Sequence, residues 1–203
     1  MNSQAGFTLT ELLIVIALIT TSAALAAPAI GAAMSERRVT QAQLDVLRVA
    51  RRARSEALAV GRAHLIRFTT ASSPGDHGRM RLYRGTTSSC GGTDWATVTG
   101  AAECIAPECI DDVNLGDSDY RASATHFVHM RGSPDNALID LCYTSSGMMW
   151  HRVSAAAPFS DQNNTNGVAG GYTFSLQSKR GGSAQGVQRW VVFPLGGTPR
   201  TRI

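Results

Sequence analysis

The pattern of hydrophobic and polar positions divides the chain into a long helix and a globular part. An apolar run from Leu12 to Met34 contains no charged residue. Because a helix rises 1.5 Å per residue, a run of this length can cross the roughly 30 Å apolar layer of a membrane. We expect Pro28 to bend this helix, since proline has no backbone N–H to donate.

A second helical pattern follows, from Glu36 to Val60. Its apolar residues recur at intervals of three, four and seven, which indicates a single apolar stripe. The stripe comprises Val39, Val46, Ala50, Ala53, Ala57 and Val60. Arginines on the other face are typical of a solvated surface, with Arg37 and Arg38 near enough to the apolar run to touch anionic lipid headgroups. Gly61 is expected to end the helix, because glycine readily adopts the left-handed conformation.

Beyond Gly61, short segments rich in β-branched and aromatic residues alternate with Gly, Ser, Pro and Asn clusters. Strands are predicted at His64–Thr70, Arg79–Arg84, Thr125–Met130, Ala137–Thr144, Met148–Val153, Gly171–Gln177 and Gln188–Phe193. A chain of 203 residues has room for one anchor and one ordinary domain. The expected fold class is α+β, with a long N-terminal helix and a β-rich head at residues 62–203.

Charge is distributed unevenly along the chain. The net charge of +4 does not by itself demand a nucleic-acid partner. The stem after Ser35 is rich in arginine, the segment from Gly85 to Tyr120 has acids but no Lys or Arg, and the segment after Asp161 has bases but no acid. We therefore expect two head surfaces of opposite potential.

The start of the apolar run carries one isolated acid, Glu11, and a charge inside a membrane needs a partner or a role. The sequence from Gly6 to Ile16 closely resembles the class III signal of type IV prepilins and pseudopilins. A glycine precedes Phe7, a glutamate stands five residues after that glycine, and an apolar helix follows. Pro28 also stands where this family places its helix-bending proline.

The resemblance implies how the N-terminus is processed and used. A prepilin peptidase would cut after Gly6 and methylate the new amine of Phe7, so that residues 1–6 are a cleaved leader. Residues 7–34 would form the transmembrane and filament-core helix, and residues 35–61 an amphipathic helix that continues into the head. Glu11 would pair with the N-terminal amine of a neighbouring subunit during assembly, as a charge in lipid is best tolerated beside its opposite.

An ordinary secretory signal is the alternative, with Ala24-Leu25-Ala26 as the cleavage triplet. Such a signal has a basic n-region, which this N-terminus lacks, and the alternative leaves Glu11 without a role. The mature chain would then begin at Ala27 without a methyl group, rather than at a methylated Phe7.

The segment Ala53–Leu58 followed by Gly61-Arg62-Ala63 resembles the helix-to-strand junction of the GspH/FimT group of minor pilins and pseudopilins. This resemblance implies antiparallel sheets packed on the last turns of the helix. Residues 86–121 have no counterpart in the resemblance and are interpreted as an insertion.

Four cysteines lie in the head and form neither a C-x-x-C pair nor a zinc-finger spacing: Cys90, Cys104, Cys109 and Cys142. An even number beyond a membrane anchor suggests two disulfides in an oxidising compartment, with reduced buried thiols as the alternative. Three pairings are possible, and we favour Cys90–Cys104 with Cys109–Cys142.

No catalytic constellation is found in the sequence. The five histidines are dispersed, and neither a nucleophile elbow nor a phosphate-binding loop is present, so we expect no enzyme and no cofactor. A cluster of acids offers oxygen ligands of the kind calcium prefers, at Asp111, Asp112, Asp117 and Asp119. Their spacing is not that of an EF-hand, so a solvated loop is favoured over a metal site.

The C-terminal segment partly resembles the Gly-Arg-x-Arg element with which FimT-type pilins bind DNA for uptake. Arg200 and Arg202 keep the spacing, but Pro199 replaces the glycine. Lys179, Arg180 and Arg189 could complete a phosphate-contacting patch, although solvated or salt-bridged arginines are the commoner case.

Together these features predict a minor pilin that primes or caps a type IV pilus. A GspH-type pseudopilin of a type II secretion system and a DNA-binding minor pilin are the alternatives. The expected partners are other minor and major pilins (or pseudopilins), the prepilin peptidase, the inner membrane and, in the third case, DNA. The chain would be a single-pass inner-membrane protein with its head in the periplasm, and would reach the cell surface in the filament.

Overall fold

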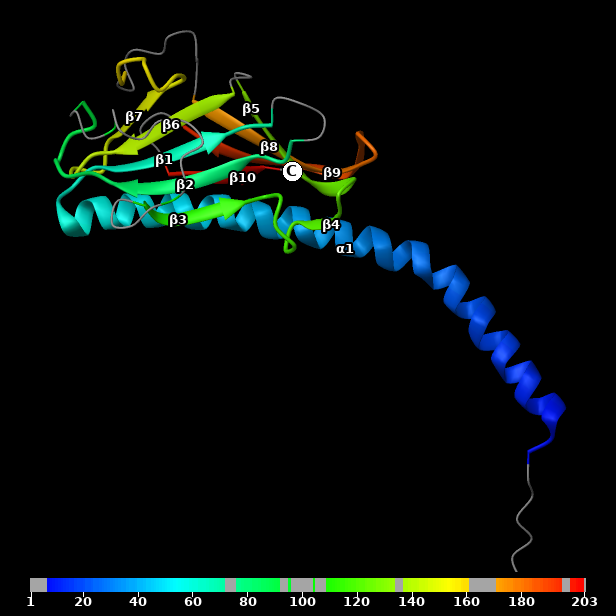
Figure 1. The fold of residues 1–203 in the computed structure, drawn as a ribbon. Helices are drawn as coiled ribbons and strands as arrows, with labels where there is room; N and C mark the ends of the chain where they lie inside the picture. The colour runs from blue at the N-terminus through cyan, green and yellow to red at the C-terminus, as the bar shows by residue number, and fades with distance from the viewer. Residues whose placement is uncertain are drawn as a thin grey trace, which may run out of the picture.

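A computed structural model describes residues 7–71, 76–91, 95, 104, 109–133, 137–160, 171–194 and 198–202. The predicted leader at residues 1–6, including Gly6, lies outside the described residues. The first described element is one continuous helix, α1 (Leu9–Val60), of 52 residues. Half of it lies along the head, and the N-terminal part curves away from the head (Figure 1).

Both ends of α1 are capped by its own sequence. Thr8 is the N-cap residue, and Gly61 closes the C-terminus in the left-handed conformation with φ 71°. The N–H of Gly61 donates to the carbonyl of Ala57 at 3.1 Å, which satisfies one of the last free carbonyls. The predicted helix end at Gly61 is therefore confirmed, and Pro28 lies within the helix.

In the described part of the chain, ten strands form two five-stranded antiparallel sheets. The first sheet has the order β3 (Cys109–Asn114), β2 (Arg79–Arg84), β1 (His64–Thr69), β6 (Leu138–Tyr143) and β7 (Met149–Arg152). The second has the order β10 (Arg200–Arg202), β9 (Ser183–Phe193), β8 (Tyr172–Arg180), β5 (His126–Ser133) and β4 (Arg121–Ser123). The α+β class and the antiparallel sheets agree with the sequence-based expectation.

All seven predicted strands are present, but β3, β4 and β10 are additional. β3 lies within residues 86–121, which were interpreted as an insertion, and pairs antiparallel with β2, with a register shift between Leu82 and Tyr83. Part of this segment thus forms an edge strand of the first sheet. Its two aspartates, residues that strands usually disfavour, concealed it in the sequence.

The core is shared by α1 and both sheets. Phe68 of β1 stacks on Phe174 of β8 with ring centroids 4.2 Å apart, and meets the edge of Phe193 of β9 at 5.6 Å. The predicted apolar stripe of α1 is buried in the same cluster, apart from Val60, which is 48% exposed at the helix end. The helix therefore completes the core instead of merely lying against it.

A smaller buried cluster gathers around Leu65 and Tyr83, both of which point away from the main core. It contains the disulfide Cys90–Cys142, while the second disulfide is Cys104–Cys109. The favoured pairing Cys90–Cys104 with Cys109–Cys142 is wrong, although two disulfides are formed as predicted. Cys142 enters this cluster from β6, opposite Leu65, and Cys109 enters it from the start of β3. Cys109 is bonded to Cys104, which lies five residues before it and packs against the same cluster.

Removing the Cys90–Cys142 disulfide should cost more stability than removing Cys104–Cys109. The first joins residues 52 apart and the second residues 5 apart. The loss of chain entropy in the unfolded state predicts about 4 kcal/mol for the longer loop and about 2 kcal/mol for the shorter one. Urea unfolding of the Cys90→Ser/Cys142→Ser and Cys104→Ser/Cys109→Ser chains would measure both, and equal losses would contradict the prediction.

Candidate assembly site: the N-terminal helix and its junction with the head

The isolated acid of the apolar run is held by the first turn of the helix. Oε2 of Glu11 accepts hydrogen bonds from the backbone N–H and the hydroxyl of Thr8, both at 2.9 Å. The N–H of Glu11 donates back to the Thr8 hydroxyl at 3.3 Å, which completes a capping box. This local partner was not anticipated from the sequence, although the Thr-x-x-Glu spacing is its signature. Within the described chain Oε1 of Glu11 accepts no hydrogen bond, so one carboxylate oxygen is open to an external cation.

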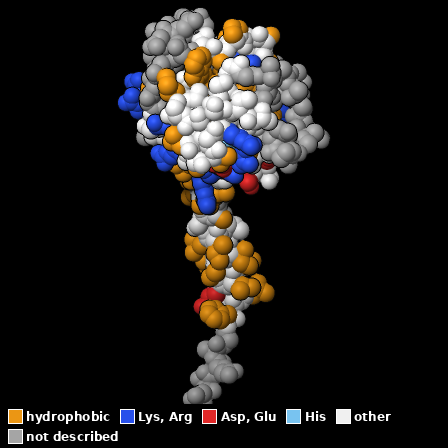
Figure 2. Space-filling view, turned by 90° about the vertical axis from the view of Figure 1, so that its left-hand side faces the viewer, with side chains coloured by type: hydrophobic (Ala, Val, Ile, Leu, Met, Phe, Trp, Pro, Cys, Tyr) orange, Lys and Arg blue, Asp and Glu red, His pale blue; other side chains and the backbone are white. Residues whose placement is uncertain are grey.

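The N-terminal part of α1 presents apolar side chains on every side. Phe7 is 88% exposed, and no residue of the most apolar stretch of the helix is buried within the protein. The described residues contain one helix that is long and apolar enough to cross a membrane. Figure 2 shows this stem projecting from a head around whose base Lys and Arg side chains gather. A surface of this kind needs lipid or other apolar helices around it.

The junction between the helix and the second sheet is fixed by Glu36. Its Oε1 accepts the backbone N–H of Val187 at 2.7 Å, and its Oε2 lies 3.6 Å from Nη2 of Arg189. Gly186 allows this approach, because a Cβ there would stand 2.3 Å from the Glu36 oxygen. Further along the helix, the amide of Gln43 donates to the carbonyl of Trp190 at 3.0 Å. The β8–β9 hairpin is thereby tied to the helix just beyond the apolar run.

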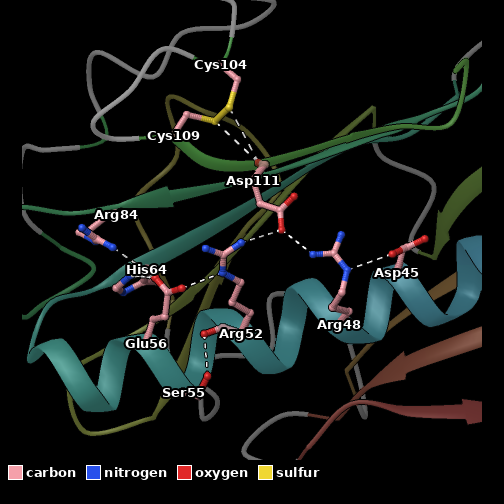
Figure 3. Close-up of polar contacts among 10 residues, drawn as sticks. All are labelled: Asp45, Arg48, Arg52, Ser55, Glu56, His64, Arg84, Cys104, Cys109 and Asp111. Carbon is pink, nitrogen blue, oxygen red and sulfur yellow. Dashed lines mark hydrogen bonds and ion pairs between the residues drawn. A yellow bond between two sulfur atoms is a disulfide. The ribbon is translucent and has the colours of Figure 1, made fainter.

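The first sheet is fastened to the helix by arginines (Figure 3). Arg48 and Arg52 donate to the same oxygen of Asp111 on β3, at 2.7 and 3.1 Å. Each is also paired within the helix, Arg48 to Asp45 at 3.0 Å and Arg52 to Glu56 at 2.7 Å. Although these arginines keep considerable exposure, they are not simply a solvated face as the sequence suggested. The charge difference between the stem and residues 85–120 was the available signal for this contact.

The pKa of Glu56 follows from this network. Partial burial opposes ionisation of the carboxyl, yet the hydrogen bond and the charge of Arg52 outweigh it and hold the pKa below its ordinary value of 4.5. Arg84 also lowers the pKa of Glu56, with its Nη2 atom 3.4 Å from Oε2 of the carboxylate.

The acids considered as weak candidates for calcium ligands are occupied by other contacts. Asp111 is bonded to two arginines, and Asp112 accepts a bidentate pair from Arg79 with Nε–Oδ1 at 2.7 Å. Asp117 accepts the amide of Asn114 at 3.0 Å. Among the described residues, no group of three or more His, Cys, Asp or Glu side chains could hold a metal ion. Asp111 and Asp112 serve ion pairs instead.

Two residues of the candidate DNA patch, Arg180 and Arg189, lie apart from the two C-terminal arginines. Arg189 is paired with Glu36, and Arg180 lines the recess between the hairpin and α1. Arg200 and Arg202 lie exposed on β10, opposite Val192 and Trp190 of β9 respectively. Residues directly opposite in antiparallel strands share a face, so the two C-terminal arginines lie beside the indole on the side facing away from the core.

Two buried histidines should make the head less stable in mild acid. Burial lowers the pKa of both His64 and His129 from the ordinary value of 6.5. Below pH 6.5 the unfolded chain therefore binds protons that the folded chain does not. The contribution of these histidines to the free energy of unfolding is fully present above pH 6.5 and is lost as the pH falls below it. We expect a lower melting temperature at pH 5.5 than at pH 7.5, and a smaller difference for His129→Gln. An unchanged melting temperature would contradict this.

Comparison with known proteins gives one match. A protein-family model described as the prokaryotic N-terminal methylation motif matches residues 1–27. No curated protein and no solved structure matches the chain. The motif, the exposed apolar helix and the antiparallel head together support a type IV pilin or pseudopilin, a structural protein anchored through its N-terminal helix and assembled with other pilins after processing by a prepilin peptidase.

Proposed function

We propose that the chain is a minor pilin of the GspH/FimT group, a low-copy subunit that primes or caps a type IV pilus. The observation that carries the proposal is the methylation motif at residues 1–27, joined through one continuous helix to a head of two sheets. The peptidase cuts after Gly6 and methylates Phe7. The helix then remains in the inner membrane, with the head in the periplasm, until the subunit enters the filament.

The structure supports assembly through two separate parts. The exposed apolar helix supplies the surface that packs among other N-terminal helices, and Glu11 has one oxygen open to a neighbour's ammonium group. The head is joined to this helix by Glu36, Gln43 and the Arg48–Asp111–Arg52 contacts. A subunit built in this way transmits the position of its helix to its head, which suits contacts with other minor subunits.

A deletion strain tests the proposal against the pseudopilin alternative. A minor pilin that primes assembly should be needed for surface pili, so the deletion strain should have few or none and regain them on complementation. Quantitative mass spectrometry of sheared filaments should find the chain well below the abundance of the major subunit. A strain that keeps its pili but loses secretion of exoproteins would instead identify a type II secretion pseudopilin.

DNA binding is the second candidate, and one row of the second sheet favours it. Arg202, Trp190, Ser175 and Arg131 lie opposite one another across β10, β9, β8 and β5. A surface recess of about 500 Å³ includes Trp190 and Arg202 together with Thr173 and Ser133. An indole in one row with two arginines can stack a base while the arginines contact phosphates.

A gel shift with single-stranded DNA tests this candidate. The Arg131→Gln/Arg202→Gln chain should bind more weakly than the unmodified chain and show a smaller dependence on salt. The matched control is Arg62→Gln/Arg121→Gln, which removes the same charge elsewhere on the surface. Equal retardation of all three chains would end the DNA-binding proposal and leave the assembly proposal intact.

A further inference from the structure

The half of α1 that carries the head has a second stripe, on the side away from the core. Its exposed members recur every three or four residues, as one helical face requires: Arg37, Gln41, Leu44, Arg48, Arg51, Ser55 and Leu58. Three of the seven are arginines and none is acidic. Leu44 and Leu58 are 58% and 53% exposed, so the stripe also presents two large apolar side chains to its surroundings. We call this face the outer stripe.

The charge of the outer stripe is only partly balanced within the chain. Arg48 is paired with Asp45 and Asp111, but Arg37 and Arg51 form no ion pair with any described residue. The acids of the helix near the stripe already have partners. Glu36 is bonded to Val187 and Arg189, and Asp45 to Arg48 and Tyr120. Glu56 is paired with Arg52. The stripe is thus a cationic surface with two apolar side chains, the composition that suits an anionic lipid surface.

The shape of the helix directs this stripe towards the membrane. The head lies on one side of α1, and the N-terminal part of the helix curves to the opposite side (Figure 1). The outer stripe therefore lies on the inner side of the curve. When the N-terminal part spans a bilayer, the stripe faces the surface from which the helix emerges, and the usual tilt of about 20° for spanning helices can bring it closer.

The stripe also begins where the apolar run ends. Arg37 follows Met34 by three residues, about 5 Å along the helix, and Leu44 lies about 15 Å beyond Met34. Arg37 is therefore at headgroup level. From there the next two turns of the helix leave the headgroup level at the angle set by the curve.

We propose that, before assembly, the outer stripe binds the anionic phospholipid surface of the membrane that its own helix spans, with Arg37 and Arg51 on lipid phosphates and Leu44 at the headgroup boundary. This inference rests on the anchoring of the chain by its N-terminal helix. It adds a membrane-bound position of the head, which the subunit must leave when it enters a filament. Anionic lipid would thus retain the unassembled subunit against the bilayer.

The test uses the full chain reconstituted in phosphatidylcholine vesicles with and without phosphatidylglycerol. An environment-sensitive fluorophore is attached at Leu44→Cys, and a control fluorophore at Ser154→Cys, an exposed position after β7. The emission at position 44 should shift to the blue when phosphatidylglycerol is present and return in high salt, while the emission at position 154 should not change. The Arg37→Gln/Arg51→Gln chain should lose the shift, and the Arg62→Gln/Arg121→Gln chain should keep it.

Two results would overturn the inference. Emission at position 44 that is the same in both vesicles would show that the stripe does not lie on anionic lipid. A shift that follows the protein-to-lipid ratio rather than the phosphatidylglycerol content would show that a second copy covers the stripe. Extraction of the chain from both vesicles by carbonate would contradict the anchor itself, and retention without a shift would contradict the stripe alone.

Discussion

A chain carrying Glu11→Ala should be cleaved normally and yet be nearly absent from sheared filaments. The cleavage site precedes Glu11 by five residues and does not need its charge. Assembly of the variant, in contrast, would leave the N-terminal amine of a neighbouring subunit without a partner inside an apolar core. Removal of one member of a desolvated charge pair should lower incorporation by about tenfold or more. Immunoblots of membrane and sheared fractions measure processing and incorporation in the same cells.

Glu11→Gln separates the pairing role from the capping box. The amide oxygen of a glutamine can accept the hydrogen bond from the backbone N–H of Thr8, so this variant keeps the local helix start and loses only the charge. The pairing role predicts that Gln fails as badly as Ala. Normal incorporation of Glu11→Gln would mean that Glu11 acts through the capping box alone.

Replacing Asp140 with alanine should destabilise the head severely. The Asp140 side chain is fully buried and accepts hydrogen bonds at 2.8 Å from Nε and Nη2 of Arg67 and from Nε of Arg152. The variant leaves two guanidinium groups in the interior without their counter-charge. Breaking a buried pair in this way costs about 3–5 kcal/mol, a large part of the 5–15 kcal/mol that stabilises a typical domain.

Urea unfolding of the full chain measures this loss as a lower midpoint. Asp117→Ala is the matched control, because Asp117 is an exposed acid whose carboxylate accepts the side-chain amide of Asn114. The control should change the midpoint little. An Asp140→Ala midpoint equal to that of the control would show that Arg67 and Arg152 are satisfied without the carboxylate.

The elements with strong local signals were predictable from the sequence. The apolar run, the stripe from Val39 to Ala57 and Gly61 define α1, because periodicity and capping act within a few residues of the chain. The strands with β-branched and aromatic residues were also found. β10 was missed because it has only three residues, and β3 because Asp111 and Asp112 look like a loop until Arg48, Arg52 and Arg79 are placed beside them.

The candidate site was predictable only where it is local in sequence. The N-terminal motif could be read directly, and the capping box of Glu11 could have been read from Thr8. The disulfide pairing could not, because it depends on which side of β6 carries Cys142 and on the path between β2 and β3. The grouping of the basic residues could not be predicted either, because it depends on the strand register. The register places Arg202 beside Trp190, and it places Arg189 on the opposite face, beside Glu36.

The mature N-terminus decides whether Glu11 has a partner, and mass spectrometry of the chain purified from its native membrane identifies that terminus. We expect a polypeptide that lacks residues 1–6 and begins at Phe7 with one methyl group on its amine, so that the ammonium group which Glu11 is to meet exists. A mature chain beginning at Met1 or at Ala27, or at an unmethylated residue elsewhere, would contradict the pairing and with it the assembly role of the helix.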